Sequence, residues 1–182
     1  MKKLMVFAFL SMLSACGSTS NLQKTQNLAT NQDISSYSCV TVDDFSHDAG
    51  KPNNDDTMKL RGKIFADTIA DEIKSKKVFD EVERGGGGSK TNSCLLIDGE
   101  IIKCDEGNAA ARMLIGLGAG SSYFDANVFF KDSKTKEVLG EIKVSQMSWA
   151  LGGALAAGQD VLSYMKAASS KIARELASAK KQ

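Results

Sequence analysis

The sequence has little of the material from which metal sites and catalytic triads are built. It contains one histidine, one tryptophan and one proline in 182 residues. A single histidine cannot build the usual zinc site, and no Cys-x-x-Cys pair is present to replace it. The Gly-x-Ser-x-Gly turn of serine hydrolases and the Gly-Lys-Ser/Thr end of a phosphate-binding loop are missing as well. We therefore expect no metal, no cofactor and no enzymatic activity.

Charge of one sign and long hydrophobic runs are also absent. The 23 basic and 22 acidic side chains leave a net charge of +1, whereas nucleic-acid binding needs a basic face. After Cys16 no apolar run approaches the roughly 20 residues that span a bilayer. We expect neither a nucleic-acid partner nor a membrane-spanning segment.

The N-terminal stretch MKKLMVFAFLSMLSAC has the features of an export signal. Lys2 and Lys3 precede a short apolar run, and small residues precede Cys16. The last four letters resemble the bacterial lipobox, which implies cleavage before Cys16, a diacylglycerol on its sulfur and an acyl chain such as palmitate on the new amino group. Residues 1–15 are then a lipoprotein signal peptide. The alternative is an ordinary signal peptide with a cysteine there by chance.

Residues 16–36 have few large apolar side chains and no sustained period, so they predict a lipidated cysteine followed by a flexible tether. About 20 residues of random coil reach about 25 Å, which would hold the domain just clear of the lipid surface. An aspartate after the lipidated cysteine often retains bacterial lipoproteins in the inner membrane, so Gly17 favours the outer membrane, facing the periplasm. Residues 37–182 remain for a single globular domain.

Apolar periodicity predicts the elements of that domain. Phe65, Ile69 and Ile73 fall four residues apart and form one stripe of a helix within residues 57–77. A second stripe begins at Val161 in the last helix. We expect strands at 37–45, 78–84, 94–104 (with a bulge at Gly99), 121–132 and 137–150. The predicted fold class is α+β, a single mixed β-sheet with two long helices packed mainly on one face.

The stretch LIGLGAGSS carries Gly116, Gly118 and Gly120. A dinucleotide-binding loop follows a strand and opens a helix, whereas here a short helix precedes the glycines and a strand follows them. The glycine spacing also departs from the dinucleotide fingerprint. Two interpretations stay open. The glycines allow a tight turn and close backbone packing, or they form an assembly surface, since Gly116 and Gly120 are four apart and Gly152 begins a similar small-residue spacing.

Three segments resemble one family. LLIDGEI, GNAAARMLIGLGAG and ANVFFKDSKTKEVL are similar to the bacterial lipoproteins grouped as domain of unknown function 4410, over about residues 37 to 178. Gly-Asn, Arg112 and Gly-x-Gly-x-Gly are the most specific part, and Lys136 departs from the glycine usual in the hairpin turn. The family has no established activity. More distantly, the layout resembles the periplasmic domains of the curli-secretion and penicillin-binding-protein-activator lipoproteins, which implies assembly or regulation.

Three cysteines remain besides Cys16, and an exported protein carries them into an oxidising compartment. Cys39 lies in the first predicted strand and Cys94 begins the third, so the two could form a disulfide if these strands are parallel neighbours. Cys94 and Cys104 are about 33 Å apart on one extended strand and cannot pair. We predict a Cys39–Cys94 disulfide with Cys104 free. Three reduced thiols that simply pack are the open alternative.

A few charged residues stand in patterns that chemistry uses. Asp43 and Asp44 could serve as acid and base, or cap a loop. Asp98 and Glu100 share one face of a strand, where they are solvated or paired with lysine. Arg112 is the one charge in a small apolar stretch. It could contact a lipid phosphate or a partner carboxylate, or it could cap the preceding loop.

Together these features predict an outer-membrane-anchored periplasmic lipoprotein that acts non-enzymatically, through protein–protein contacts in envelope assembly or regulation. Its expected partners are the membrane, through the N-terminal lipid, and either another envelope protein or further copies of itself. The alternative is a self-associating subunit of a ring or secretion pore. The candidate interaction residues are Arg112, Gly116, Gly118, Gly120 and Gly152.

Overall fold

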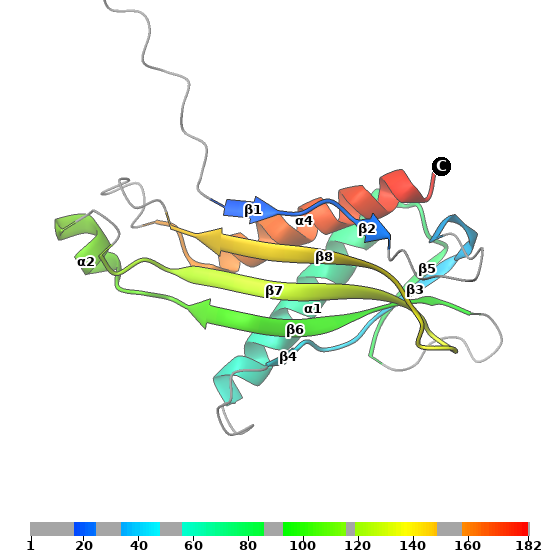
Figure 1. Cartoon of the computed structure of the whole chain (residues 1–182), viewed down its shortest axis with the longest axis horizontal. Helices are drawn as coiled ribbons and strands as arrows, with labels where there is room; N and C mark the ends of the chain where they lie inside the picture. Colours follow the sequence, from blue (N-terminus) through cyan, green and yellow to red (C-terminus); the bar gives the residue numbers. More distant parts are fainter. Residues whose placement is uncertain are drawn as a thin grey trace, which may run out of the picture.

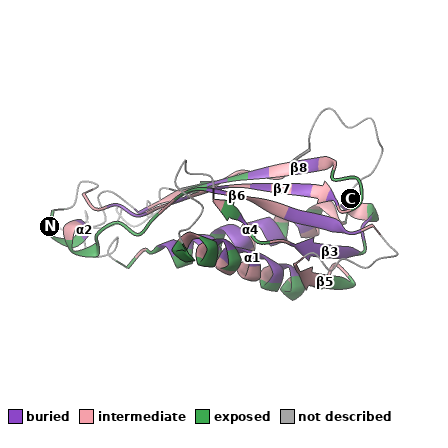
Figure 2. Ribbon diagram, turned by 90° about the horizontal axis from the view of Figure 1, so that it is seen from below, coloured by how far each residue is buried: buried purple, intermediate pink, exposed green. Residues whose placement is uncertain are grey.

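The alternating segments of the sequence come together in one sheet. The computed structural model describes residues 17–24, 34–47, 56–85, 93–115, 119–148 and 158–181. Within them, eight strands form a mixed sheet in the order β1-β8-β7-β6-β3-β5, with β2 also on β8 and β4 also on β6. Both long helices lie on the same side of it (Figure 1; Figure 2). The predicted α+β class and the helix-covered face are confirmed.

The centre of the sheet is antiparallel. It consists of β6 (Leu95–Asp105), β7 (Tyr123–Asp132) and β8 (Val138–Met147). Every second side chain of β7 is buried, starting with Phe124, because that face of the strand packs toward the helices. In the turn between β7 and β8, Lys136 has a φ of 61°, a left-handed conformation that favours glycine. Lysine at this position is therefore less favourable than glycine would be.

The bulge predicted at Gly99 is wrong, because the register of β6 against β7 shifts between Ile101 and Lys103 instead. Gly99 lies in regular strand and serves close packing. A Cβ at this position would lie 2.7 Å from the Phe45 ring and 3.1 Å from the carbonyl carbon of Asn127. The glycine is therefore required by its neighbours rather than by an irregular backbone.

The other half of the sheet is parallel. The short strands are β3 (Cys39–Val42), β4 (Ser46–His47) and β5 (Glu81–Arg84). β3 lies between β5 and β6 and is parallel to both, and β4 continues alongside β6. The Nδ1 atom of His47 is 3.0 Å from the carbonyl oxygen of Ile101, which can only accept, so the imidazole helps to hold β4 on β6.

The helices bury the stripes that the sequence predicts. The long ones are α1 (Asp56–Lys76) and α4 (Val161–Ala179), and the short ones are α2 (Ala109–Leu114) and the 3-10 helix η1 (Ile34–Ser36). Phe65, Ile69 and Ile73 of α1 are at most 1% exposed. α4 starts with a capping box in which Asp160 and Ser163 satisfy each other's backbone N–H groups. No helix among the described segments is long and apolar enough to cross a membrane.

The segment predicted as a flexible tether is in part ordered structure. β1 (Gly17–Thr19) and β2 (Gln23–Lys24) pair antiparallel with β8, and Ile34 is 2% exposed in the core. Without them β8 would be an exposed edge strand with unpaired N–H and C=O groups. This segment is held on the sheet by backbone hydrogen bonds, although its side chains lack an apolar period. The sequence pattern reports side chains only, so it could not predict this pairing.

Candidate interaction surface

Cys39 and Cys94, the pair predicted from the sequence, are joined by a disulfide in the structure, with their Cα atoms 4.8 Å apart. They meet because β3 and β6 are parallel neighbours with Val40 opposite Leu95. Cys104 is the free cysteine in the described part of the chain. Burial, above all, raises the pKa of the Cys104 thiol to about 11. The thiol is therefore protonated at neutral pH and is a poor nucleophile.

A buried carboxylate holds the β7–β8 turn. Asp132 is 2% exposed. One of its oxygens accepts hydrogen bonds from the hydroxyls of Ser93 and Tyr37, the latter at 2.8 Å, and the other accepts from the backbone N–H groups of Lys134 and Thr135, each at 2.8 Å. Burial raises the pKa of Asp132, but these hydrogen bonds outweigh it and hold the pKa well below its usual range. Burial and the same contact raise the pKa of Tyr37. The carboxylate is a structural group.

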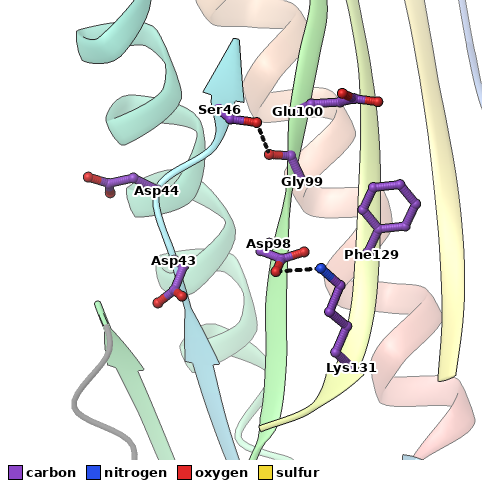
Figure 3. A pocket seen from close by; sticks show the side chains of 8 residues that line it. All are labelled: Asp43, Asp44, Ser46, Asp98, Gly99, Glu100, Phe129 and Lys131. Carbon is purple, nitrogen blue, oxygen red and sulfur yellow. Dashed lines mark hydrogen bonds and ion pairs between the residues drawn. The ribbon is translucent and has the colours of Figure 1, made fainter. Parts of the chain in front are cut away.

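An open pocket of about 360 Å³ lies beside β4 and β6 (Figure 3). Most of its charged groups have partners within the chain, although one oxygen each of Asp43 and Asp98 is buried without a hydrogen bond. Lys131 donates to Asp98 at 2.7 Å, and Asp44 forms an ion pair with Arg84. Asp43 and Asp44 point in different directions in the close-up, which does not suit an acid–base pair (Figure 3). The described residues include no cluster of three or more side chains that could hold a metal ion.

The face of β6, β7 and β8 that points away from the helices is covered by no described helix or strand (Figure 2). Two aromatic rings lie on it. Lys103 Nζ sits 3.6 Å from the ring centroid of Tyr123, and Lys131 Nζ sits 5.4 Å from that of Phe129. Rings with polar neighbours are typical of protein-contact surfaces. We call this surface the open face; its side chains are Asp98, Glu100, Tyr123, Asp125, Asn127, Phe129, Lys131, Glu141 and Lys143.

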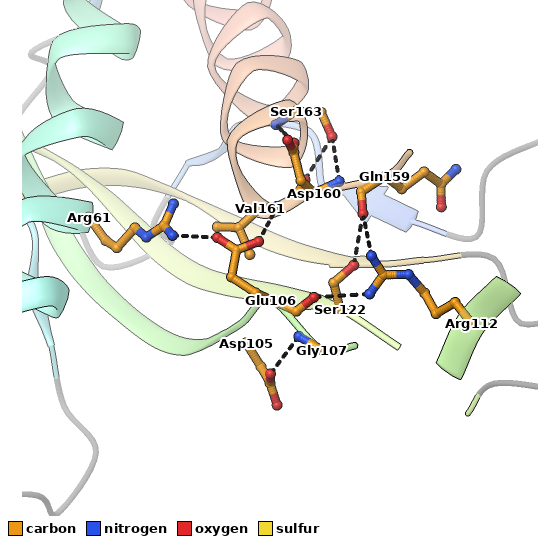
Figure 4. A network of polar contacts seen from close by, with 10 residues as sticks. All are labelled: Arg61, Asp105, Glu106, Gly107, Arg112, Ser122, Gln159, Asp160, Val161 and Ser163. Atoms are coloured by element: carbon orange, nitrogen blue, oxygen red, sulfur yellow. Dashed lines mark hydrogen bonds and ion pairs between the residues drawn. The ribbon is translucent and has the colours of Figure 1, made fainter. Parts of the chain in front are cut away.

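Arg112 anchors α2 to the end of the sheet (Figure 4). The residue is 6% exposed, and its guanidinium donates to the carbonyl oxygens of Glu106 at 2.9 Å, Gly120 at 2.8 Å and Gln159 at 3.3 Å. Of the roles that the sequence left open for Arg112, the structure shows the loop cap. Its nitrogens point toward the backbone of its own chain and present little to a lipid phosphate or a partner carboxylate.

Glu106, which the sequence analysis did not single out, joins three helices at this end (Figure 4). Its carboxylate pairs with Arg61 of α1 and accepts from the N–H of Val161, the first residue of α4, at 3.4 Å. Its carbonyl accepts from Arg112 of α2. A glutamate in a short polar loop carries no sequence pattern that marks such a role. The consequence is that α2 and the first turns of α1 and α4 are held together.

Five of the six large apolar side chains that are exposed in the described part of the chain lie in or next to these helices, and the sixth, Ile102, lies in β6. Leu114 is 82% exposed, Ile115 67% and Met113 62%. α2 is only six residues long and buries only Arg112, so the Met-Leu-Ile run at its end has no core to enter. This run of three apolar residues is visible in the sequence and could have been used to predict an exposed apolar surface. We call this run, Met113, Leu114 and Ile115, the apolar end.

Gly120 supports the packing interpretation of the glycines. Its φ is 68°, and a Cβ there would lie 2.9 Å from the Cβ of Ala111. Gly116, Gly118 and Gly152 lie outside the described residues, as does Cys16. Their part in an assembly surface, and the lipid on Cys16, therefore stay predictions.

The fold and these surfaces define a small α+β domain with one sheet face free of helices and a supported apolar end. The chain belongs to the family Domain of unknown function (DUF4410), whose model matches residues 19–152. The resemblance drawn from the sequence is confirmed. A comparison with curated proteins finds no match.

Solved structures share the fold. The PelC dodecamer from Paraburkholderia phytofirmans matches with a TM-score of 0.56 at 10% identity, over 88% of this chain and 96% of that one. A point variant of that dodecamer in another crystal form gives a TM-score of 0.55 with the same identity and coverage. A DUF330 protein from Xanthomonas campestris matches with a TM-score of 0.44 at 12% identity, over 74% of this chain and 80% of that one. At such identities the likeness is one of fold.

Proposed function

We propose that this protein is a lipoprotein of the bacterial outer membrane that is anchored through Cys16, faces the periplasm, and acts without catalysis through protein contacts in envelope assembly or regulation. The observation that carries the proposal is the open face. A three-stranded antiparallel surface with Tyr123 and Phe129 on it lies opposite the helix layer. Aromatic side chains flanked by charges are the composition from which protein contacts draw their affinity.

The use of charge within the fold supports the same proposal. Arg112 and Asp132 are buried, and the Arg112 NH groups and both Asp132 oxygens bond to groups of their own chain. Lys103 and Lys131 stand over the aromatic rings of the open face rather than beside a nucleophile. For the anchor, the support is the sequence LSAC that ends at Cys16, together with the charged start and the short apolar run before it.

A photo-cross-linking amino acid on the open face tests the contact in living cells. Asn127 lies in the middle of this face, whereas Lys166 is exposed on α4, on the helix side of the sheet. We expect a defined adduct from the probe at 127 and none from the matched probe at 166. Equal labelling from both positions, or none from either, would count against the open face as the contact surface.

Labelling of the protein with radioactive palmitate tests the anchor. We expect the label to be lost in the Cys16→Ala variant.

A self-associating ring subunit is the second candidate. The PelC structures that share this fold are dodecamers, and an open sheet face or a glycine segment would supply the contact. The molar mass of the chain without its lipid, measured by light scattering after gel filtration, separates the two candidates. A ring-sized mass would favour self-association, whereas a monomeric mass would contradict constitutive assembly by the domain alone.

A further inference from the structure

The first described residues place the lipidation site at one end of the sheet. Gly17 lies opposite Gln146 on β8, and Ser20 donates from its backbone to Lys143 at 2.9 Å. Cys16 is therefore one residue from a paired strand, and no length of free chain separates it from the domain. A lipid on Cys16 would hold this end of the domain at the membrane surface.

The apolar end is at the same end of the molecule. β8 finishes one residue after Gln146, at Met147, and the N–H of the next residue, Ser148, donates to the carbonyl of Ser122 at 3.0 Å. The hydroxyl of Ser122 in turn donates to the carbonyl of Gln159, which also accepts from Arg112 of α2. Figure 1 shows the consequence, with α2 and the start of β1 both at the end of the sheet where β8 terminates.

We infer that the apolar end inserts into the same membrane leaflet as the acyl chains of Cys16, so that Met113, Leu114 and Ile115 form a second, protein-made contact with lipid. This inference rests on the lipid anchor proposed above. Amphipathic surface segments of this kind bury their apolar side chains to about 5–10 Å, at the boundary of headgroups and acyl chains.

The distribution of exposed side chains along the molecule supports this orientation. At the opposite end, the exposed residues of the described turn and C-terminus are polar, among them Thr135, Lys136 and Lys181. None of the large apolar side chains that are exposed in the described segments lies there. If the N-terminus is held at a membrane, the apolar end faces the lipid and the polar end faces away from it.

Lipid is a better occupant than a second copy of the chain. Met113 and Leu114 end a helix of six residues and Ile115 follows it; all three are largely exposed, so they need either a deformable phase or a matching apolar hollow to cover them. The pocket beside β4 is lined by carboxylates and offers no such hollow. Arg61 and Glu106 pair with each other, and Arg112 donates to carbonyl oxygens of its own chain, so the contact is apolar and is expected to resist salt.

Tryptophan fluorescence in vesicles tests the inference on the mature, acylated chain. Trp149, the single native tryptophan, is replaced by Phe, and one new tryptophan is placed by Leu114→Trp, Ile115→Trp or, as the distant control, Lys181→Trp. The proteins are reconstituted in vesicles of phosphatidylethanolamine and phosphatidylglycerol, with or without phosphatidylcholine brominated on its acyl chains. Two positions in the apolar end guard against the failure of one variant to fold.

We expect bromine to quench at least about half of the emission at positions 114 and 115 and less than about a tenth at 181, with little change at high salt. Weak and equal quenching at all three positions overturns the inference. Emission at position 114 that is blue-shifted, depends on protein concentration and is not quenched by bromine also overturns the inference. That result would favour contact between copies of the chain. The mass of the N-terminal peptide separates the two claims. An unacylated Cys16 refutes the anchor itself, whereas failed quenching in an acylated chain refutes only the insertion.

Discussion

Gly62 lies in the second turn of α1, and we expect its replacement by alanine to destabilise the fold. This is the reverse of the usual effect of a glycine-to-alanine change in a helix. In an exposed helix interior, replacing glycine by alanine stabilises by about 1 kcal/mol. Here the helix backbone packs directly on the strand segment at Phe45. A Cβ on residue 62 would lie far inside contact with the carbonyl oxygen of Phe45 and 3.1 Å from its carbonyl carbon. The atom that must give way is backbone, between β3 and β4.

The size of the effect follows from how far α1 must move. Carbon atoms pack at about 3.5–4.0 Å, so α1 must retreat from Phe45 by about 1 Å. That shift loosens Phe65, which packs on Phe45 with ring centroids 4.8 Å apart and on Phe124 at 4.9 Å. Overpacking a core costs about 1–3 kcal/mol, and the loss of these aromatic contacts adds to it. After the gain in helix propensity we expect Gly62→Ala to destabilise by about 2–3 kcal/mol.

Urea unfolding of the chain without its lipid, followed by circular dichroism, measures this change. With an m-value of about 2 kcal/mol/M, the midpoint falls by about 1 M or more. Lys63→Ala is the matched control, because Lys63 is the next residue of the same helix and is exposed. It should change stability by less than about 0.5 kcal/mol. A Gly62→Ala protein as stable as the parent would refute the close approach of α1 to Phe45.

Three further predictions concern single groups. Lys77 follows α1 with a φ of 53°, so Lys77→Gly should stabilise by about 0.5–1 kcal/mol in thermal melts, whereas the control Lys76→Gly, inside the helix, should destabilise. Asp132→Asn should cost about 2–4 kcal/mol at neutral pH. Because the folded pKa of Asp132 is lowered, its contribution is complete above the unfolded value of about 4 and is lost as pH falls through the folded one. The urea midpoints of parent and variant should therefore converge in acid; a constant gap would contradict this. The Cys39–Cys94 disulfide closes a loop of 55 residues, so its reduction should cost about 4 kcal/mol, and alkylation of the unfolded, unreduced protein should label neither cysteine.

Elements with a clear apolar period could be predicted from the sequence. Phe65, Ile69 and Ile73 are buried as their spacing indicates, and the β7–β8 hairpin follows its alternation. The disulfide followed from one topological assumption, that the first and third predicted strands are parallel neighbours, which β3 and β6 satisfy. The spacing of apolar residues determines which side of a helix or strand faces the core, and this information was sufficient to predict these elements.

The rest depends on contacts between segments far apart in the chain. β1 joins β8 across more than a hundred residues through backbone groups, which every sequence has, so its composition predicted coil. Glu106 acts through Arg61 and Val161, which belong to two different helices. No local pattern states that these three residues meet. The Met-Leu-Ile run was visible, but only the length of α2 shows that it stays outside.

The proposed anchor and the open face are compatible because of how the strands run. With the apolar end at the leaflet, β7 points away from the membrane, and its 10 residues rise by about 34 Å at about 3.4 Å each. Tyr123 then lies near the lipid, Phe129 about 20 Å further out, and the β7–β8 turn at the far tip. A partner in the periplasm would meet the open face from the side, without competing with the lipid for the apolar end. Removing the acyl chains should therefore weaken membrane contact while leaving cross-linking at Asn127 to a soluble partner intact, which a single shared surface would not allow.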